Sequence, residues 1–206
     1  MIKRFLKRTA CLALAAVLLA CAVSCGKRNE TTAGSTDSGA NVNASENALA
    51  LLGKVWASYG ENEKFPASGG DEANLNYEGP GKFEVGNAEM LDGVLGLPST
   101  LADKVDDAAS LIHAMNVNTF TCGVFRFKNA GDASASASKI KENILSRRWM
   151  CGFPDTVLIM SAPGGYIIAV WGIDNDTEGE NIITTFKQKV LSAISGSAVI
   201  AEEPIV

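Results

Sequence analysis

The C-terminal half of the chain alternates between apolar segments with the composition of strands and amphipathic segments with the period of helices. Segments rich in β-branched and aromatic residues predict four strands, at 119–127, 156–161, 166–171 and 198–201. Helical patterns lie between them, one from Asp132 to Arg148 and one from Glu178 to Ile194. The order strand, helix, strand, strand, helix, strand predicts an α+β domain with a ferredoxin-like core and an antiparallel sheet.

The predicted sheet is apolar on both of its faces. In the second strand, Val157 and Ile159 point to one face, and Leu158 and Met160 point to the other. An antiparallel sheet with helices on one side normally alternates apolar and polar residues, so here a second layer must cover the other face. The N-terminal helices, led by an amphipathic helix predicted at 45–59, are expected to supply that layer. A face left uncovered would be a partner-binding surface.

The segments that follow this first helix give weaker patterns. Residues 61–82 are rich in Gly, Asn, Glu and Pro and are expected to be irregular. A short helix is predicted from Asn87 to Leu95, with a second helical piece over 100–109. Asp106 and Asp107 would lie on the solvated face of that piece.

The first 25 residues pass from a basic start through an apolar run to small residues and a cysteine. The apolar run covers about 14 residues, whereas a helix that crosses a bilayer needs about 20. This order predicts a secretory signal peptide over 1–24. Because Cys25 follows the cleavage position, we expect a lipoprotein, anchored by a diacylglyceryl group and acyl chains such as palmitate. Its place would be the extracytoplasmic face of a bacterial cell membrane.

A second cysteine offers an alternative attachment point. The sequence Leu18-Leu19-Ala20-Cys21 also has the form of a lipobox. Cys25 is favoured because glycine and polar residues follow it, whereas more apolar chain follows Cys21. Residues 25–44, rich in Thr, Ser, Asn and Gly, are predicted to be the lipidated cysteine and a flexible tether. Residues 45–206 then form a single α+β domain.

Removal of the signal peptide leaves a strongly acidic protein. The whole chain has 18 Lys and Arg against 23 Asp and Glu, and the signal peptide holds four of the cations and none of the anions. The mature chain therefore carries 14 cations, and its net charge is −9. Such a charge argues against nucleic acid as a partner and against electrostatic binding to anionic lipid. Membrane attachment is left to the lipid anchor, and a protein partner in the envelope stays open.

Two further cysteines remain once Cys25 is acylated. Cys122 and Cys151 lie outside the cytosol in this interpretation, so they are candidates for a disulfide that closes a loop of about 30 residues. The alternative is a pair of buried, unbonded thiols. The spacing alone does not distinguish the two, because a disulfide depends on the separation of the Cα atoms.

Candidate chemistry is sparse along the chain. His113 is the single histidine and has no companion cluster, so we expect a structural role and no zinc site. The acidic run Asp174–Glu180 resembles the first half of an EF-hand loop, but Thr185 stands where a bidentate Glu is required. Acidic residues at the start of a helix are the simpler explanation. We therefore expect no catalytic, cofactor-binding or metal-binding residues.

Several motifs resemble a known family. They are Ile112–Phe120 leading into Phe125–Lys128, the segment Arg148–Pro154, and the turn Gly164-Gly165-Tyr166 before an apolar strand. Over roughly 48–206 the chain is similar to small lipoproteins of clostridia and their relatives that carry domain of unknown function forty-three fifty-eight. The resemblance implies an envelope location and a domain type. It implies no activity and no functional residues, since the family is uncharacterised.

These observations favour a non-catalytic module of the cell envelope. We expect a lipid-anchored binding or structural module that is not an enzyme. The alternative is an accessory or ligand-binding component of a transport or sensing system. A concave pocket with a few convergent polar groups would favour that alternative.

Overall fold

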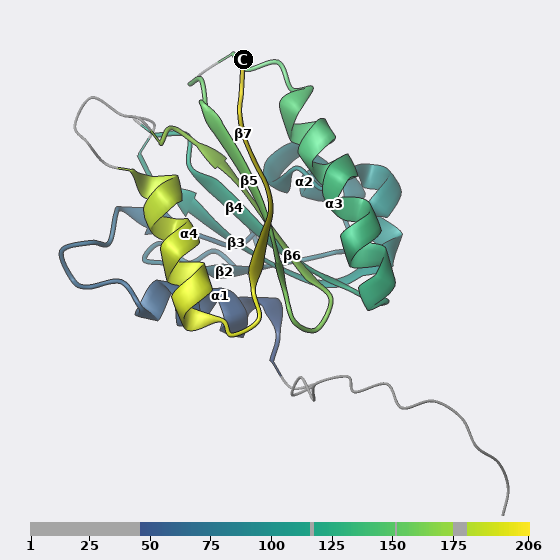
Figure 1. Cartoon of the computed structure of the whole chain (residues 1–206), viewed down its shortest axis with the longest axis horizontal. Coiled ribbons are helices and arrows are strands. Elements are labelled where there is room, and N and C mark those ends of the chain that lie inside the picture. The colour runs from purple at the N-terminus through teal and green to yellow at the C-terminus, as the bar shows by residue number, and fades with distance from the viewer. Residues whose placement is uncertain (1–45, 116–117, 151, 175–180) are drawn as a thin grey trace, which may run out of the picture. The chain divides into compact units, whose positions relative to one another are not determined.

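The computed structural model describes residues 46–115, 118–150, 152–174 and 181–206, and they form an α+β domain (Figure 1). Among these residues the helices are α1 (Ala48–Ala57), α2 (Ala88–Leu95), α3 (Ala130–Leu145), α4 (Ile182–Ala193) and a short 3-10 helix, η1 (Ser99–Lys104). The strands are β1 (Ala67–Ser68), β2 (Gly81–Phe83), β3 (Val105–His113), β4 (Thr121–Phe127), β5 (Thr156–Ala162), β6 (Tyr166–Gly172) and β7 (Ala198–Pro204).

The strands form one antiparallel sheet of seven strands within the described residues. Their order is β1-β3-β4-β6-β5-β7, and β2 also pairs with β3. The α+β class and the antiparallel sheet are therefore confirmed. The ferredoxin-like strand order is wrong, because that arrangement places the last strand beside the first strand of the core. Here β3 occupies that side of β4, and β7 pairs with β5 instead.

The strand β3 replaces most of the helical piece predicted at 100–109, which is wrong beyond η1. Ala108, Ala109 and Ser110 are fully buried between β2 and β4. The Ser110 hydroxyl accepts a hydrogen bond from the backbone N–H of Gly70 at 2.8 Å. Small residues have little intrinsic preference for strands, so the pairing of β3 on both edges sets its conformation.

The displaced last strand explains why α3 and α4 lie on opposite faces of the sheet. The crossover β4-α3-β5 passes over β6, and β6-α4-β7 passes over β5 in the same direction across the sheet. Because β4 and β6 run antiparallel, two crossovers of the same hand place their helices on opposite faces. In the ferredoxin-like order the second crossover runs the other way, and both helices share one face.

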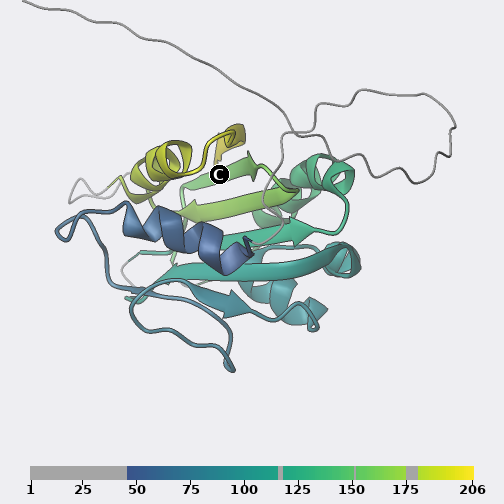
Figure 2. The ribbon, with the colours of Figure 1, turned by 90° about the horizontal axis from the view of Figure 1, so that it is seen from below.

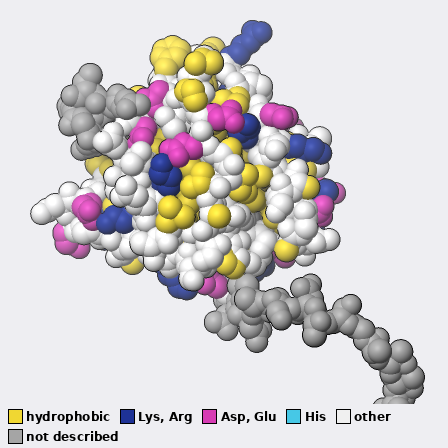
Figure 3. All heavy atoms as spheres, viewed as in Figure 1, with side chains coloured by type: hydrophobic (Ala, Val, Ile, Leu, Met, Phe, Trp, Pro, Cys, Tyr) yellow, Lys and Arg dark blue, Asp and Glu magenta, His cyan; other side chains and the backbone are white. Residues whose placement is uncertain are grey.

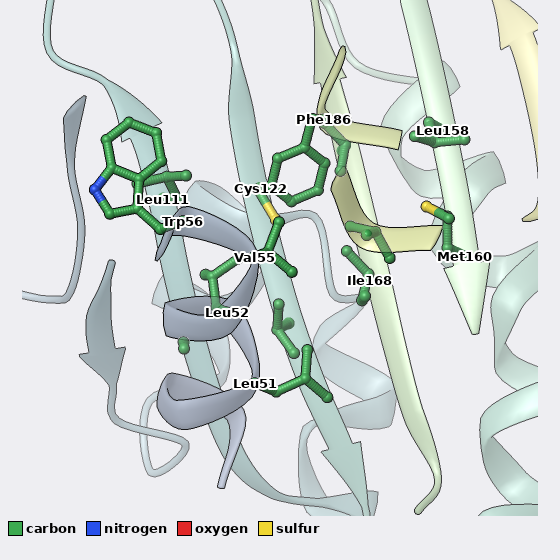
Figure 4. Packing of buried hydrophobic residues seen from close by; sticks show 14 of the residues in the cluster. Leu51, Leu52, Val55, Trp56, Leu111, Cys122, Leu158, Met160, Ile168 and Phe186 are labelled. Atoms are coloured by element: carbon green, nitrogen blue, oxygen red, sulfur yellow. The ribbon is translucent and has the colours of Figure 1, made fainter. Parts of the chain in front are cut away.

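Each face of the sheet is covered by one helix from the N-terminal half and one from the C-terminal half, so the prediction that the N-terminal helices together cover one face is wrong. Figures 1 and 2 show α1 and α4 on one side of the sheet and α2 and α3 on the other. On the first side, Leu52 and Val55 of α1 lie beside Cys122 and Phe186 (Figure 4). The predicted alternation is confirmed, since Leu158 and Met160 belong to this cluster whereas Val157 and Ile159 belong to the other.

Asparagines begin three of the helices. The side chains of Asn47, Asn87 and Asn129 accept hydrogen bonds from the backbone N–H groups of Ala50, Met90 and Gly131. This satisfies donors that a helix cannot satisfy itself, and it fixes where each helix starts. The start predicted at Asn87 is confirmed, whereas α1 begins after Asn47 rather than at Ser45.

Several predicted features lie outside the described residues. They are the signal peptide, the lipidation site Cys25 with its alternative Cys21, the tether, Cys151 and the acidic run 175–180. No helix within the described residues is long and apolar enough to cross a membrane.

Candidate functional site

A cavity of about 430 Å³ lies at the end of the sheet where β3 and β6 end and β4 begins. Its described wall comes from α2, the β3–β4 connection, the segment after α3, and β6. The side chains at this wall include those of His113, Thr119, Phe120, Arg147, Trp149 and Trp171. The wall residues that the structure describes include no Asp and no Glu. We name this the Arg147 cavity.

Arg147 supplies the positive charge of this cavity. Its Cζ lies 5.1 Å from the centroid of the Trp171 ring, and its guanidinium donates to the backbone carbonyl of Asp92. The Asp92 carboxylate is 3.8 Å away and accepts hydrogen bonds from Asn143 at 2.9 Å and from the Ser99 N–H at 3.1 Å. Burial lowers the pKa of Arg147, and Asp92 opposes that shift. Arginine nevertheless stays protonated near neutral pH.

The aromatic part of the wall also carries polar groups that the described protein does not satisfy. The rings of Trp149 and Trp171 are tilted at 47° with their centroids 6.2 Å apart. Trp149 Nε1 and Thr119 Oγ1 are both buried and have no hydrogen-bond partner among the described residues. An unsatisfied buried polar atom costs about 1–3 kcal/mol. Buried polar atoms of this kind need a partner from beyond the described side chains.

Gly152 brings the segment after α3 against Thr119. Its φ is +80°, which glycine adopts without steric cost. A Cβ at this position would stand 2.3 Å from Cγ2 of Thr119. The close approach of these two parts of the cavity wall therefore depends on the absence of a side chain at position 152.

His113 is held at the same wall by an aromatic ring and by backbone. It stacks on Phe65 with ring centroids 5.3 Å apart and planes 9° apart. Its Nδ1 is 3.0 Å from the backbone oxygen of Met115 and 3.2 Å from the Met115 nitrogen. The hydrogen bonds of this ring within the described residues involve only Met115. The described residues thus bring no acid–base partner to His113, and the expectation that the chain is not an enzyme stays a prediction.

The acidic residues that the sequence singled out are placed as follows. Asp174 caps α4, because its two carboxylate oxygens accept hydrogen bonds from the N–H and the hydroxyl of Thr184. Asp106 and Asp107 lie on β3 rather than on a helix; Asp106 pairs with Arg126 at 2.7 Å, and Asp107 accepts from the N–H of Ala48. Within the described part of the chain, no group of three or more His, Cys, Asp or Glu is arranged to hold a metal ion.

The predicted cysteine pair is described only in part. Cys122 is fully buried between α1 and the sheet, and burial raises the pKa of its thiol well above the usual value. Cys151 lies outside the described residues, so the predicted disulfide stays a prediction.

A second cavity of about 300 Å³ lies between the segment after α1 and the start of α4. Beside this cavity, Lys189 Nζ donates hydrogen bonds to Glu63 Oε2 at 2.7 Å and to the Ser58 carbonyl at 3.1 Å. Tyr59 lines this cavity, and its buried hydroxyl has no hydrogen-bond partner among the described residues. Beside this cavity the Lys189 ammonium and the Glu63 carboxylate lie 2.7 Å apart, whereas the Asp92 carboxylate lies 3.8 Å from the Arg147 guanidinium. We therefore take the Arg147 cavity as the candidate site.

Comparison of the chain with known proteins identifies no relative that could inform the role of this site. No family model, no curated protein and no solved structure matches the chain. Sequence reasoning placed Arg147 at the end of a helix but did not assign it a site. The only local signal was the gathering of Arg147, Trp149 and Gly152 just after α3, which has no fixed spacing to recognise.

Proposed function

We propose that this chain is a lipid-anchored ligand-binding module on the extracytoplasmic face of a bacterial membrane, with the Arg147 cavity as its binding site. The observation that carries the binding role is a partly buried arginine packed against Trp171, in a cavity without a described carboxylate in its wall. A concave pocket with convergent polar groups is the usual form of a small-molecule site. It favours the ligand-binding component of a transport or sensing system over a purely structural module.

The anchoring part of the proposal rests on the N-terminal sequence. The basic start, the short apolar run and the small residues before Cys25 are the features of a lipoprotein signal. The resemblance to small clostridial lipoproteins supports the same location. The lipid would supply the membrane affinity that the acidic mature chain lacks.

Metabolic labelling tests the anchor directly. Cells that express the full chain are grown with an alkyne analogue of palmitate, beside cells that express Cys25→Ser or Cys21→Ser. We expect the label on the wild type and on Cys21→Ser, and its loss on Cys25→Ser. Label that persists on Cys25→Ser and disappears on Cys21→Ser would move the attachment to Cys21. An unlabelled wild type would overturn the lipid anchor.

A further inference from the structure

The wall of the Arg147 cavity includes three side chains that can donate hydrogen bonds: Arg147, Trp149 and Thr119. A guanidinium has donors only, an indole N–H has a donor only, and a threonine hydroxyl can donate. We propose that the ligand of this cavity is a small aromatic carboxylate, whose carboxylate pairs with Arg147 and whose ring packs against Trp149. This inference rests on the proposed binding function and specifies its ligand class.

The charge of the cavity selects an anion. The mature chain has 14 cations against 23 anions, yet the described wall of this cavity contains Arg147 and no Asp or Glu. A positive charge held in a concave site attracts anions, and here it is only partly offset by the Asp92 carboxylate 3.8 Å from Arg147. The acidic residues elsewhere would repel an anion in solution, so recognition depends on this one site.

Arg147 has unused hydrogen-bonding capacity. A guanidinium carries five N–H donors, and within the described residues Arg147 donates a hydrogen bond to the Asp92 backbone carbonyl. The Asp92 carboxylate, at 3.8 Å, is beyond hydrogen-bonding distance. Asn143 and Ser99 already bind that carboxylate. Arg147 therefore keeps donors for a ligand carboxylate, which a guanidinium binds through two parallel hydrogen bonds.

The remainder of the wall suits a flat ring. Trp149 is half-buried at this wall, and the nearly buried Trp171 steadies the guanidinium of Arg147. An aromatic ligand can pack edge-to-face or offset against the ring of Trp149. Trp149 Nε1 and Thr119 Oγ1 are buried within the same wall, so Arg147 is the group that we assign to the carboxylate. The volume of about 430 Å³ lies within the range of small-ligand sites.

The test compares two probes of the same shape that differ in charge. Phenylacetate and phenylacetamide are titrated separately into the mature protein carrying Cys25→Ser, and binding is followed by tryptophan fluorescence and by chemical-shift changes of the indole N–H groups. We expect phenylacetate to bind at least about tenfold more tightly than phenylacetamide, the preference that a charge-assisted hydrogen bond provides. Acetate, which lacks the ring, should bind more weakly than phenylacetate.

Two variants locate the effect. Arg147→Met should abolish the preference for the carboxylate, whereas Arg148→Met, a matched change at an exposed neighbour, should preserve it. Because Arg147→Met could disturb folding, Arg147→Lys is measured beside it, with far-UV circular dichroism as the folding check. Lysine keeps the charge but loses the two-pronged geometry, so it should retain only part of the preference.

The outcomes separate the ligand class from the broader function. Equal binding of the two probes, or no binding of phenylacetate up to about 10 mM, a weak-ligand limit, overturns the aromatic carboxylate. If palmitate labelling of Cys25 succeeds while the probes fail, the lipid-anchored location stands and only the ligand class falls. If Arg148→Met changes the preference as much as Arg147→Met, the assignment to the Arg147 cavity falls.

Discussion

Asp174 binds Thr184 through both of its carboxylate oxygens. Oδ1 accepts the backbone N–H of Thr184 at 2.9 Å, and Oδ2 accepts its hydroxyl at 2.6 Å. Asp174 is nearly buried, and it reaches α4 from the chain that follows β6. The first residue of the run that resembles half of a calcium loop is therefore already engaged in capping a helix.

Asp174→Ala should lower the free energy of unfolding by about 1–2 kcal/mol, because α4 loses a side-chain cap. Chemical denaturation measures the loss. Asp103→Ala removes an exposed carboxylate of the same kind and should change stability by less than about 0.5 kcal/mol. Millimolar calcium should leave the unfolding midpoint of the wild type unchanged, and a calcium-dependent rise that Asp174→Ala removes would contradict this assignment.

Asp71 predicts a dependence of stability on pH. Burial raises the pKa of this carboxyl, but hydrogen bonds from Glu84, Asn74 and Ala73 outweigh burial and hold the pKa below its usual 3.8. A lowered folded-state pKa stabilises the fold above the unfolded value, and that contribution is lost as pH falls through the folded pKa. Asp71→Asn should therefore be less stable than the wild type by about 1 kcal/mol near neutral pH.

The stability difference between Asp71→Asn and the wild type should shrink as the pH is lowered below about 4, and denaturation series over this range would measure it. Glu72→Gln provides a matched change at the exposed neighbouring residue. A difference that stays constant with pH would show that the charge of Asp71 does not contribute.

Gly152 predicts a steric effect at the cavity wall. Gly152→Ala should destabilise the protein by about 1–3 kcal/mol, because alanine is strained at a φ of +80° and its Cβ would meet Thr119. Gly93→Ala is the control on the opposite wall. Gly93 lies inside α2 with open space around its Cα, so alanine there should stabilise by up to about 1 kcal/mol. Thermal unfolding of both variants tests the contrast.

The Cys122 thiol should resist modification in the folded protein. Burial blocks access to its sulfur and raises its pKa, so little thiolate is present near neutral pH. In the mature chain with Cys25→Ser and Cys151→Ser, a thiol reagent should label Cys122 only after denaturation. Rapid labelling of the native protein would contradict the packing around this residue. The predicted disulfide is tested in the variant that carries Cys25→Ser alone, denatured without a reductant. Two thiols should react if Cys122 and Cys151 are unbonded, and none if they form a disulfide.

The edge strand β7 carries exposed apolar residues together with paired carboxylates, and we expect those carboxylates to limit self-association. Its Val199 and Ile200 are 40% and 44% exposed, and apolar side chains gather in this region of the surface (Figure 3). Lys187 pairs with Glu202 at 2.7 Å, and Lys141 pairs with Glu203. Charged side chains on an edge strand discourage pairing with another chain.

Removing both carboxylates, with Glu202→Ala and Glu203→Ala, should increase concentration-dependent association in sedimentation velocity. The change in folding stability should be small, since exposed ion pairs contribute about 0–1 kcal/mol each. The double variant Glu61→Ala and Glu72→Ala makes the same change in net charge at exposed loop positions and should stay as monomeric as the wild type. Equal association of the two double variants would attribute the effect to net charge rather than to the edge.

The sequence predicted those parts of the fold that local pattern determines. The alternation of Leu158 and Ile159 between the two faces and the start of α2 at Asn87 are set by neighbours along the chain. The strand β3 could not be predicted in this way, because Ala108 and Ala109 suit a helix and become a strand only through pairing on both edges. Missing that one strand was enough to predict the wrong position for β7.

The candidate site was beyond sequence reasoning for a related reason. Arg147, Trp171 and His113 are far apart in the sequence and meet only because three strand ends lie together. Trp149 and Thr119 become notable only once burial shows that their polar atoms lack partners among the described residues. The positions of these residues in the sequence follow no helical or strand period, so their proximity could not be predicted from the sequence.

The pairing of α1 with α4 on one face has a consequence for how the protein comes to be folded. Lys189 of α4 contacts Ser58, just beyond α1, across 131 residues of chain. During synthesis the first helix emerges early, yet the apolar face that it covers stays open until the last helix and strand have been made. Contacts of such long sequence separation form slowly. The apolar surface of the N-terminal part therefore stays exposed during synthesis until α4 and β7 pack onto the sheet.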